Sequence, residues 1–106
     1  MSAHVQEINE LNFEREVLAS ETPFLLEFHA PWCGPCKAME PLLDSLAREK
    51  VGALKVGKID IEACPALTTQ LGVRGAPTLV MFRGGREVGR RLGAGSRSAV
   101  LALAGM

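Results

Sequence analysis

Trp32-Cys33-Gly34-Pro35-Cys36 stands where an apolar, strand-like run ends and a helical pattern begins. The apolar run extends from Phe24 to Ala30, and the helical pattern extends from about Cys33 through Ala47. Both thiols therefore fall on the first turn of a helix, where free amide N–H groups and the helix dipole favour an anion. An anion on Cys33 is a thiolate, the reactive form of cysteine. With two residues between them, the thiols can close a disulfide and reopen it, so the segment predicts a redox switch.

Two other interpretations of the cysteine pair compete with the redox switch. Zinc requires four ligands, and the remaining candidates are Cys64, His4 and His29, none of which has the spacing of a ligand pair. A purely structural disulfide would gain little stability, because so short a loop removes little entropy from the unfolded chain. The pattern favours redox chemistry and predicts no metal site.

The residues around the pair resemble the active-site signature of the thioredoxin family. The signature is Ala30-Pro31-Trp32-Cys33-Gly34-Pro35-Cys36-Lys37, and the resemblance continues through Pro41, Lys58, Gly75-Ala76-Pro77-Thr78 and Gly93. It implies a single thioredoxin domain over residues 1–106, an α/β fold in which four helices flank a central mixed five-stranded sheet. It also implies a thiol-disulfide oxidoreductase that reduces protein disulfides through a Cys33/Cys36 dithiol–disulfide cycle. Such a protein is a general electron donor for cell redox homeostasis.

Composition agrees with one small globular unit. The chain has 106 residues, 47% hydrophobic and 23% charged, which is enough for one core. No apolar run approaches the roughly 18 residues of a membrane span, and Met1 to Leu11 lacks the basic start and apolar centre of a signal peptide. Three cysteines with one evident pair suit a reducing compartment. We therefore expect a cytoplasmic protein that does not associate with membranes.

The net charge is zero, but the first half of the chain is acidic and the second half is basic. The basic cluster consists of Arg83, Arg86, Arg90, Arg91 and Arg97. It either steers acidic partners or nucleic acid toward the protein, or it is the solvated face of a terminal hairpin and helix. No aromatic residues alternate with these arginines, which argues against binding of single strands by stacking. We favour the solvated face and expect no nucleic-acid partner.

Periodicity along the chain predicts the element order β-α-β-α-β-α-β-β-α, a parallel part followed by an antiparallel hairpin. The predicted strands are Val5–Ile8, Phe24–Ala30, Ala53–Asp60, Thr78–Phe82 and Glu87–Leu92, and the predicted helices are Phe13–Ala19, Cys33–Ala47, Pro65–Leu71 and a last helix capped by Ser96. Asn12 or Glu10 is the expected cap of the first helix. Pro41 is expected to kink the second helix, and Gly84-Gly85 to form the hairpin turn.

Glu27 is a carboxylate inside an otherwise apolar strand. Burying it in ionised form is costly, so it must be paired, wetted or neutral. Lys58 is the obvious partner if the two strands are adjacent; alternatively, both residues reach solvent and have no catalytic task. The family resemblance implies a catalytic role. Thioredoxins usually carry an aspartate at the position of Glu27, linked to a lysine at the position of Lys58. In the family, this aspartate helps to move the proton to and from the second cysteine. Here the acidic side chain is one methylene longer.

The resemblance also implies a substrate surface around Cys33. Pro77 would be cis and lie against the active-site disulfide, leaving the backbone of Ala76 free to pair with an extended substrate segment. A trans proline that merely opens a strand is the alternative. The expected substrate-binding residues are Trp32, Gly34, Pro35, Gly75, Ala76, Pro77, Gly93 and Ala94.

Two further titratable residues each admit two interpretations. His29 either tunes the thiolate, because it titrates near neutral pH close to the site, or packs beneath the active-site helix. Cys64 is either a regulatory or dimerising thiol at a helix start or a buried, inert cysteine. We favour the structural interpretation of both.

The resulting hypothesis assigns the attack on substrate to Cys33 and the release of reduced substrate to Cys36, assisted by Glu27 and Lys58. The resemblance implies no bound cofactor, recharging by NADPH through a thioredoxin reductase, and disulfide-containing proteins as substrates of a monomer. Two rival functions remain. One is an oxidase or isomerase, although enzymes of that kind in this superfamily usually carry a histidine between the cysteines. The other is a binding subunit in which the cysteines only provide a docking face.

Overall fold

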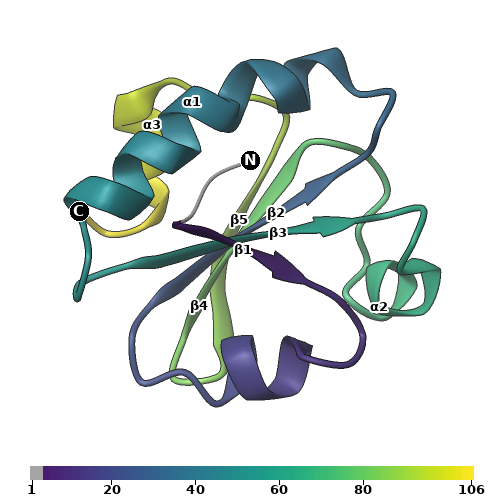
Figure 1. Ribbon diagram of the computed structural model, residues 1–106, viewed down its shortest axis with the longest axis horizontal. Helices are drawn as coiled ribbons and strands as arrows, with labels where there is room; N and C mark the ends of the chain where they lie inside the picture. The colour runs from purple at the N-terminus through teal and green to yellow at the C-terminus, as the bar shows by residue number, and fades with distance from the viewer. Residues whose placement is uncertain (1–3) are drawn as a thin grey trace.

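The computed structural model describes residues 4–106 and contains one five-stranded sheet (Figure 1). The strands are β1 (Val5–Ile8), β2 (Phe24–His29), β3 (Lys55–Asp60), β4 (Thr78–Arg83) and β5 (Arg86–Leu92), in the order β1-β3-β2-β4-β5. β1, β3 and β2 run parallel, whereas β4 is antiparallel to β2 and β5 is antiparallel to β4. The helical segments are the π-helical turn η1 (Glu14–Leu18) and the helices α1 (Gly34–Glu49), α2 (Pro65–Gln70) and α3 (Arg97–Leu103). The predicted order of elements and the mixed sheet are confirmed.

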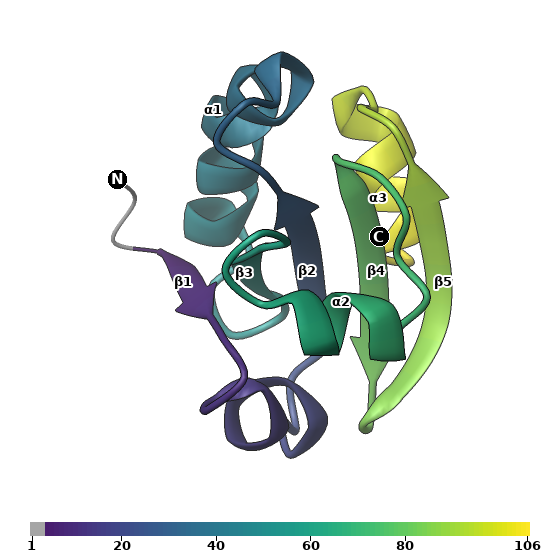
Figure 2. The same ribbon diagram turned by 90° about the vertical axis from the view of Figure 1, so that its right-hand side faces the viewer.

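The sheet is covered on both faces. α1 and α3 lie on one face, and η1 and α2 lie on the other (Figures 1 and 2). Successive strand residues point to opposite faces, so the central strand β2 contributes to two cores. Phe24, Leu26 and Phe28 pack toward η1 and α2, while Leu25 packs toward α1 and α3. Because β2 is buried on both sides, its sequence reads as an almost continuous apolar run.

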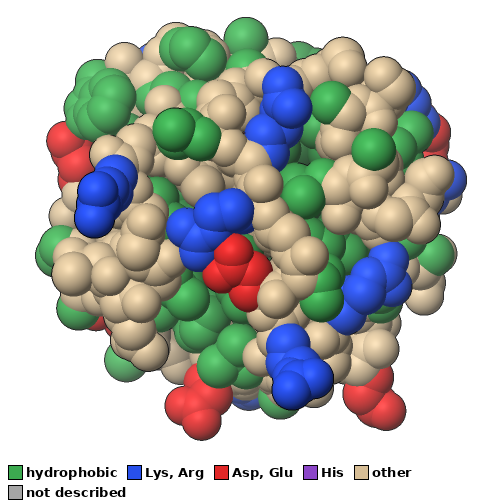
Figure 3. Space-filling model, turned by 180° about the vertical axis from the view of Figure 1, so that it is seen from behind, with side chains coloured by type: hydrophobic (Ala, Val, Ile, Leu, Met, Phe, Trp, Pro, Cys, Tyr) green, Lys and Arg blue, Asp and Glu red, His purple; other side chains and the backbone are tan. Residues whose placement is uncertain are grey.

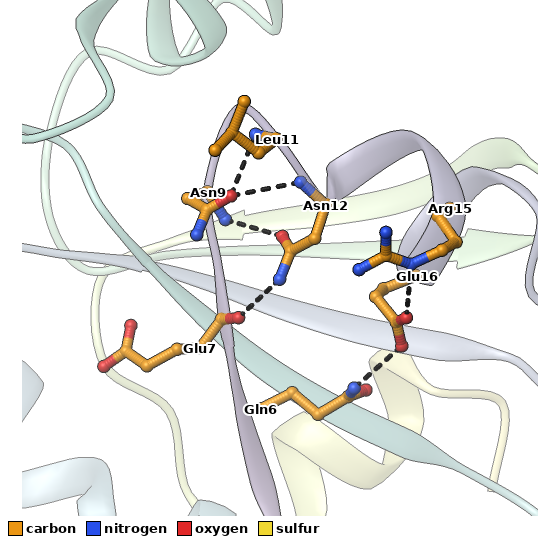
Figure 4. Close-up of polar contacts among 7 residues, drawn as sticks. All are labelled: Gln6, Glu7, Asn9, Leu11, Asn12, Arg15 and Glu16. Carbon is orange, nitrogen blue, oxygen red and sulfur yellow. Dashed lines mark hydrogen bonds and ion pairs between the residues drawn. The ribbon is translucent and has the colours of Figure 1, made fainter.

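The first helical segment differs from the prediction. It is a short π-helical turn, and its entry is set by Asn9 together with Asn12 rather than by Asn12 or Glu10 alone. Asn9 Oδ1 accepts hydrogen bonds from the Leu11 N–H (2.8 Å) and the Asn12 N–H (3.0 Å), and Asn12 Oδ1 accepts one from the Asn9 N–H (2.8 Å; Figure 4). Asparagine side chains readily satisfy nearby amides in this way. This reciprocal pair replaces the predicted cap.

Local features elsewhere follow the sequence closely. Gly84 and Gly85 have φ values of 59° and 78°, as a two-residue hairpin turn between twisted strands requires. Ser96 caps α3, since its Oγ accepts a hydrogen bond from the Ala99 N–H at 3.2 Å. Pro41 lies within α1, which is assigned as one helix from Gly34 to Glu49. No helix in the described part of the chain combines the length and apolar character needed to cross a membrane.

Most arginines of the basic cluster are bound to other parts of the fold. Arg83 donates to the Ala104 carbonyl at the end of α3 (2.5 Å), and Arg91 donates to the Ala94 carbonyl (3.2 Å). Arg90 donates to the Leu71 carbonyl at the end of α2 (2.7 Å), and Arg97 pairs with Glu49 on α1. Lys and Arg side chains spread over the face seen in Figure 3, with apolar groups between them. These contacts favour the interpretation as a structural, solvated face.

Candidate active site

The two thiols of the central motif lie at the start of α1, as predicted. Cys33 is the N-cap residue, with extended backbone angles (φ −89°, ψ 103°), and its sulfur is bonded to that of Cys36. Cys33 Sγ also accepts a hydrogen bond from the Cys36 N–H at 3.1 Å. Pro35 lies in the first turn, where its missing N–H leaves no helical hydrogen bond unmade. The amide that holds this sulfur would stabilise a negative charge on it once the disulfide is reduced.

The disulfide is almost completely covered. Cys33 is 2% exposed and Cys36 is 3% exposed, and both pack with Ala30 and against Ile61 and Ala76. Exposure therefore does not distinguish the two sulfurs in the oxidised protein. What distinguishes them is the cap position, because Cys33 alone accepts the first-turn amide.

The loop before β4 and the end of β5 meet beside the cysteines. The peptide bond between Ala76 and Pro77 is cis, as the resemblance implied, and Ala76 packs against the cysteine cluster. The Gly93 N–H donates to the Pro77 carbonyl at 2.8 Å, which joins the two segments. The structure thus brings Ala76, Pro77 and Gly93 to the disulfide. Gly75 is tied to the same segment, since its carbonyl accepts a hydrogen bond from Thr78 Oγ1 at 2.7 Å.

Two residues that the sequence analysis did not select belong to this surface. Leu92 is 74% exposed, and its Cδ1 would lie 3.6 Å from a Cβ placed on Gly75. In the sequence, a leucine between Arg91 and Gly93 at the end of a polar strand is the pattern that could have indicated an exposed apolar side chain here. Glu62 accepts a hydrogen bond from the indole N–H of Trp32 at 2.6 Å, and Trp32 is 63% exposed. No sequence pattern indicated this contact, because it joins loops 30 residues apart.

Glu27 lies beneath α1, on the sheet face that carries Leu25. It is 2% exposed, and its Oε2 has no hydrogen-bond partner among the described residues. Burial raises the pKa of Glu27 to about 7, against the opposing effect of Lys58 and with a further increase from Glu40. The side chain is therefore close to half protonated near neutral pH.

Lys58 is aligned with Glu27 across β3 and β2, so the predicted adjacency of the two strands is confirmed. The predicted direct pairing is wrong. Within the described chain, the ion pairs of Lys58 are with Glu7 (Nζ to Oε1, 4.0 Å) and Glu40 (Nζ to Oε2, 3.9 Å), and none joins it to Glu27. Two further carboxylates compete for the ammonium group, which the strand pattern alone did not show.

A pocket of about 250 Å³ opens next to the buried carboxyl group. Its lining consists of Val5, Glu27, Glu40, Pro41, Leu43, Asp44 and Lys58. Four of the lining side chains are ionisable, and the pocket is large enough for several water molecules. Of the three states expected for Glu27, a partly neutral carboxyl beside a pocket that could hold water describes it best.

The other two titratable residues behave as structural groups. His29 is half-buried, and its burial, together with the charge of Lys58, lowers its pKa. Its Nε2 is buried without a hydrogen-bond partner in the described chain. Cys64 is 4% exposed, and burial raises the pKa of its thiol. Both findings favour packing roles over the tuning and regulatory roles.

No cluster of three or more His, Cys, Asp or Glu side chains within residues 4–106 could hold a metal ion. The chemical capacity of the site resides in the cysteine pair, which can store and release two electrons.

Comparison with known proteins gives a consistent result. The family model described as Thioredoxin matches residues 4–104. Thioredoxin C-2 of Corynebacterium nephridii is 39% identical over 102 residues, covering 96% of this chain and 94% of the relative. The thioredoxin of Haemophilus influenzae is 44% identical over 92 residues, or 87% of this chain and 86% of the relative. Thioredoxin M5, chloroplastic, of Oryza sativa subsp. japonica is 43% identical over 86 residues, which is 81% of this chain and 50% of the relative.

Proposed function

The chain belongs to the thioredoxin family and is a protein-disulfide oxidoreductase that works through the Cys33–Cys36 pair, and we propose that Cys33 is the attacking thiol and Cys36 the resolving thiol. The observation that supports this division of roles is the hydrogen bond from the Cys36 N–H to Cys33 Sγ at the N-cap of α1. A thiolate at that position is stabilised by the helix start.

The proposed reaction transfers two electrons in two exchanges. The Cys33 thiolate attacks one sulfur of a substrate disulfide, the substrate S–S bond breaks, and the other substrate sulfur leaves as a thiolate that takes up a proton. Cys36 then loses its proton and attacks Cys33 Sγ. The mixed disulfide breaks, the second substrate sulfur leaves as a thiolate, and the Cys33–Cys36 disulfide forms. The substrate is reduced and the cysteine pair is oxidised.

Glu27 is the proposed acceptor of the Cys36 proton, through water. Its pKa of about 7 suits this task, because a group that is half protonated near neutral pH both accepts and releases protons readily. Lys58 supplies the opposing positive charge that keeps the ionised form accessible. These two residues act on the proton and do not form bonds with the substrate.

The proposed substrate surface surrounds the disulfide. It consists of Trp32, Gly34, Pro35, Gly75, Ala76, Pro77, Gly93 and Ala94, to which we add Leu92 because it is exposed and lies beside Gly75. An extended substrate segment would pair with the backbone of Ala76 and place its disulfide over Cys33. Exposed Trp32 and Leu92 provide apolar contacts on this surface.

The cell context is part of the same proposal. The oxidised pair is recharged by NADPH through a thioredoxin reductase, and disulfide-containing proteins are the substrates. We expect one thioredoxin domain over residues 1–106, acting as a monomer in the cytoplasm, with no nucleic-acid or membrane partner. The cysteine pair itself carries the electrons, so the chemistry requires no bound cofactor.

Reduction of insulin, followed by turbidity, tests the roles of the two cysteines. Cys33→Ser should be inactive, since it removes the attacking sulfur. Cys36→Ser should accumulate a mixed disulfide with insulin, visible by mass spectrometry, because nothing resolves it. Full activity of Cys33→Ser would refute the assignment. If the chain were only a binding subunit, the variant with both serines would keep its stable partners.

A further inference from the structure

Lys58 lies between three carboxylates. Glu7, Lys58 and Glu27 occupy aligned positions on the neighbouring strands β1, β3 and β2, so their side chains share the sheet face beneath α1. Glu40 reaches the same lysine from α1. The lysine stands about 4 Å from Glu7 and Glu40 and forms no ion pair with Glu27 among the described residues.

The two outer carboxylates are at the surface, whereas the lysine is largely covered. Side-chain exposure is 19% for Lys58, 58% for Glu40 and 61% for Glu7. In Figure 4 the carboxylate of Glu7 points away from the asparagine pair, and the side-chain amide of Asn12 donates to the backbone carbonyl of Glu7 (3.0 Å). The Glu7 carboxylate is therefore not engaged by the η1 entry and can face the lysine.

Glu40 also stands close to the redox pair along the helix. It follows Cys36 by four residues on α1, and residues at this spacing are neighbours on a helix surface. The pocket beside Glu27 is lined by Glu40 and Lys58. A proton that passes between Cys36 and Glu27 through water can leave to bulk solvent past these two side chains.

We propose that Glu40, aided by Glu7, is a positioning residue that holds Lys58 away from Glu27, so that the buried carboxyl faces pocket water instead of an ammonium group. This inference rests on the proposed role of Glu27 as proton acceptor. In the resolving step the Cys36 thiol proton passes to the Glu27 carboxylate through water, and neutral Glu27 later returns it to bulk water. Burial is the main cause of the raised pKa of Glu27; the charge of Lys58 lowers this pKa, and the charge of Glu40 raises it to a smaller extent.

Several other charged groups occupy the elements packed around Glu27. They are His29 on β2, Lys55 and Asp60 on β3, Arg83 on β4, and Lys37, Asp44, Arg48 and Glu49 on α1. Asp44 lines the same pocket but pairs with Arg48 at 3.3 Å. Asp44→Asn is a matched control for Glu40→Gln, because it removes one carboxylate from the same pocket, whereas the ion pairs of Lys58 within residues 4–106 are with Glu7 and Glu40.

The test is a titration of Glu27 in the oxidised protein by NMR of ¹³C-labelled glutamate side chains. Glu40→Gln should lower the pKa of Glu27 by about half a unit or more, because Lys58 is then free to approach it. Asp44→Asn should shift it by less than about 0.2 units. In a Lys58→Met background, the effect of Glu40→Gln should fall to less than half. If Lys58→Met does not fold, Glu7→Gln serves instead and should shift the pKa downward with Lys58 present.

An unchanged Glu27 pKa in Glu40→Gln would overturn the inference, and so would an equal shift with and without Lys58. The pH profile of the resolving step should move to lower pH in Glu40→Gln by the same amount as the titration. If the pKa of Glu27 shifts in Glu40→Gln but the pH profile of the resolving step does not, this result would also contradict the inference. The titration uses no substrate, so failure of the wild type to reduce insulin would refute the proposed function without deciding this inference.

Discussion

Glu27 is a buried carboxyl whose Oε2 has no hydrogen-bond partner among residues 4–106. A fully paired carboxylate would stay ionised, and a fully dry one would stay neutral. This side chain lines a pocket that also contains Glu40, Asp44 and Lys58, and Lys58 is paired with Glu7 and Glu40. Burial and the charges of Lys58 and Glu40 together set the pKa of Glu27 near 7. Ionising this side chain in the folded protein therefore costs stability.

The pKa of Glu27 has a predictable effect on stability. A carboxyl whose pKa rises on folding, from 4.5 to about 7, contributes stability at acidic pH that is lost as pH rises between these values. The loss amounts to about 3 kcal/mol. Urea unfolding of the oxidised protein should therefore show a fall in unfolding free energy across this range. Glu27→Gln should abolish most of the fall and be more stable than the wild type at pH 8.

Glu14→Gln is the control, since Glu14 is exposed and its removal should leave the pH dependence intact. A Glu27→Gln profile parallel to that of the wild type would contradict the assignment of this titration to Glu27.

The limits of sequence reasoning are visible at this residue. The expense of burying Glu27 and the adjacency of Lys58 followed from the apolar character of both strands. The diversion of Lys58 did not, because Glu7 and Glu40 come from β1 and α1, and only the packed fold brings them to the lysine. Likewise, the Trp32–Glu62 contact depends on where two loops come to rest.

At the scale of elements, hydrophobic patterns were sufficient to predict the buried strands and α1, whereas β5 was predicted from the Gly84-Gly85 turn that joins it to β4. The doubly buried β2 and the amphipathic α1 carry strong patterns. The first helical segment was harder, because its entry is made by side chains before the helix. Asn9 satisfies two amides that a helix cap would otherwise serve. An asparagine four residues before Phe13 gives no periodic signal.

The η1 entry provides a second stability prediction. Asn9→Ala should lower the free energy of unfolding by about 1 kcal/mol, because the Leu11 and Asn12 amides lose their common acceptor. Glu10→Ala, which removes the side chain that the sequence offered as a cap, should have a smaller effect. Chemical denaturation of both variants distinguishes the two caps. A larger loss in Glu10→Ala would restore the sequence-based assignment.

For the whole molecule, topology assembles the site from distant segments. The motif follows β2, the Ala76–Pro77 bond precedes β4, and Gly93 follows β5; the antiparallel pairings of β4 with its neighbours bring these ends together. Most arginines of the basic cluster join separate segments of the fold. Arg90, on the edge strand β5, donates to the carbonyls of Leu71 and Gly72, which directly follow α2.

The structural role of Arg90 can be separated experimentally from electrostatic steering of acidic partners. Arg90→Met should lower the free energy of unfolding by about 1–2 kcal/mol, because the Leu71 and Gly72 carbonyls lose their donor. Its kcat/KM for insulin reduction should stay within about twofold of the wild type. Arg86→Met removes the same charge from the same strand and should cost less stability. If both variants lost activity at low salt and neither lost stability, steering would be the better explanation.

The most direct test of the central claim measures how much of Cys33 is thiolate at neutral pH. Reduced protein is alkylated with iodoacetamide across a pH series, and mass spectrometry locates the modified cysteine. If the start of α1 holds the sulfur as an anion, the rate at Cys33 at pH 7 should reach roughly half of its high-pH plateau. A rate of only a few per cent of the plateau, as for cysteine in a short unstructured peptide, would contradict the account.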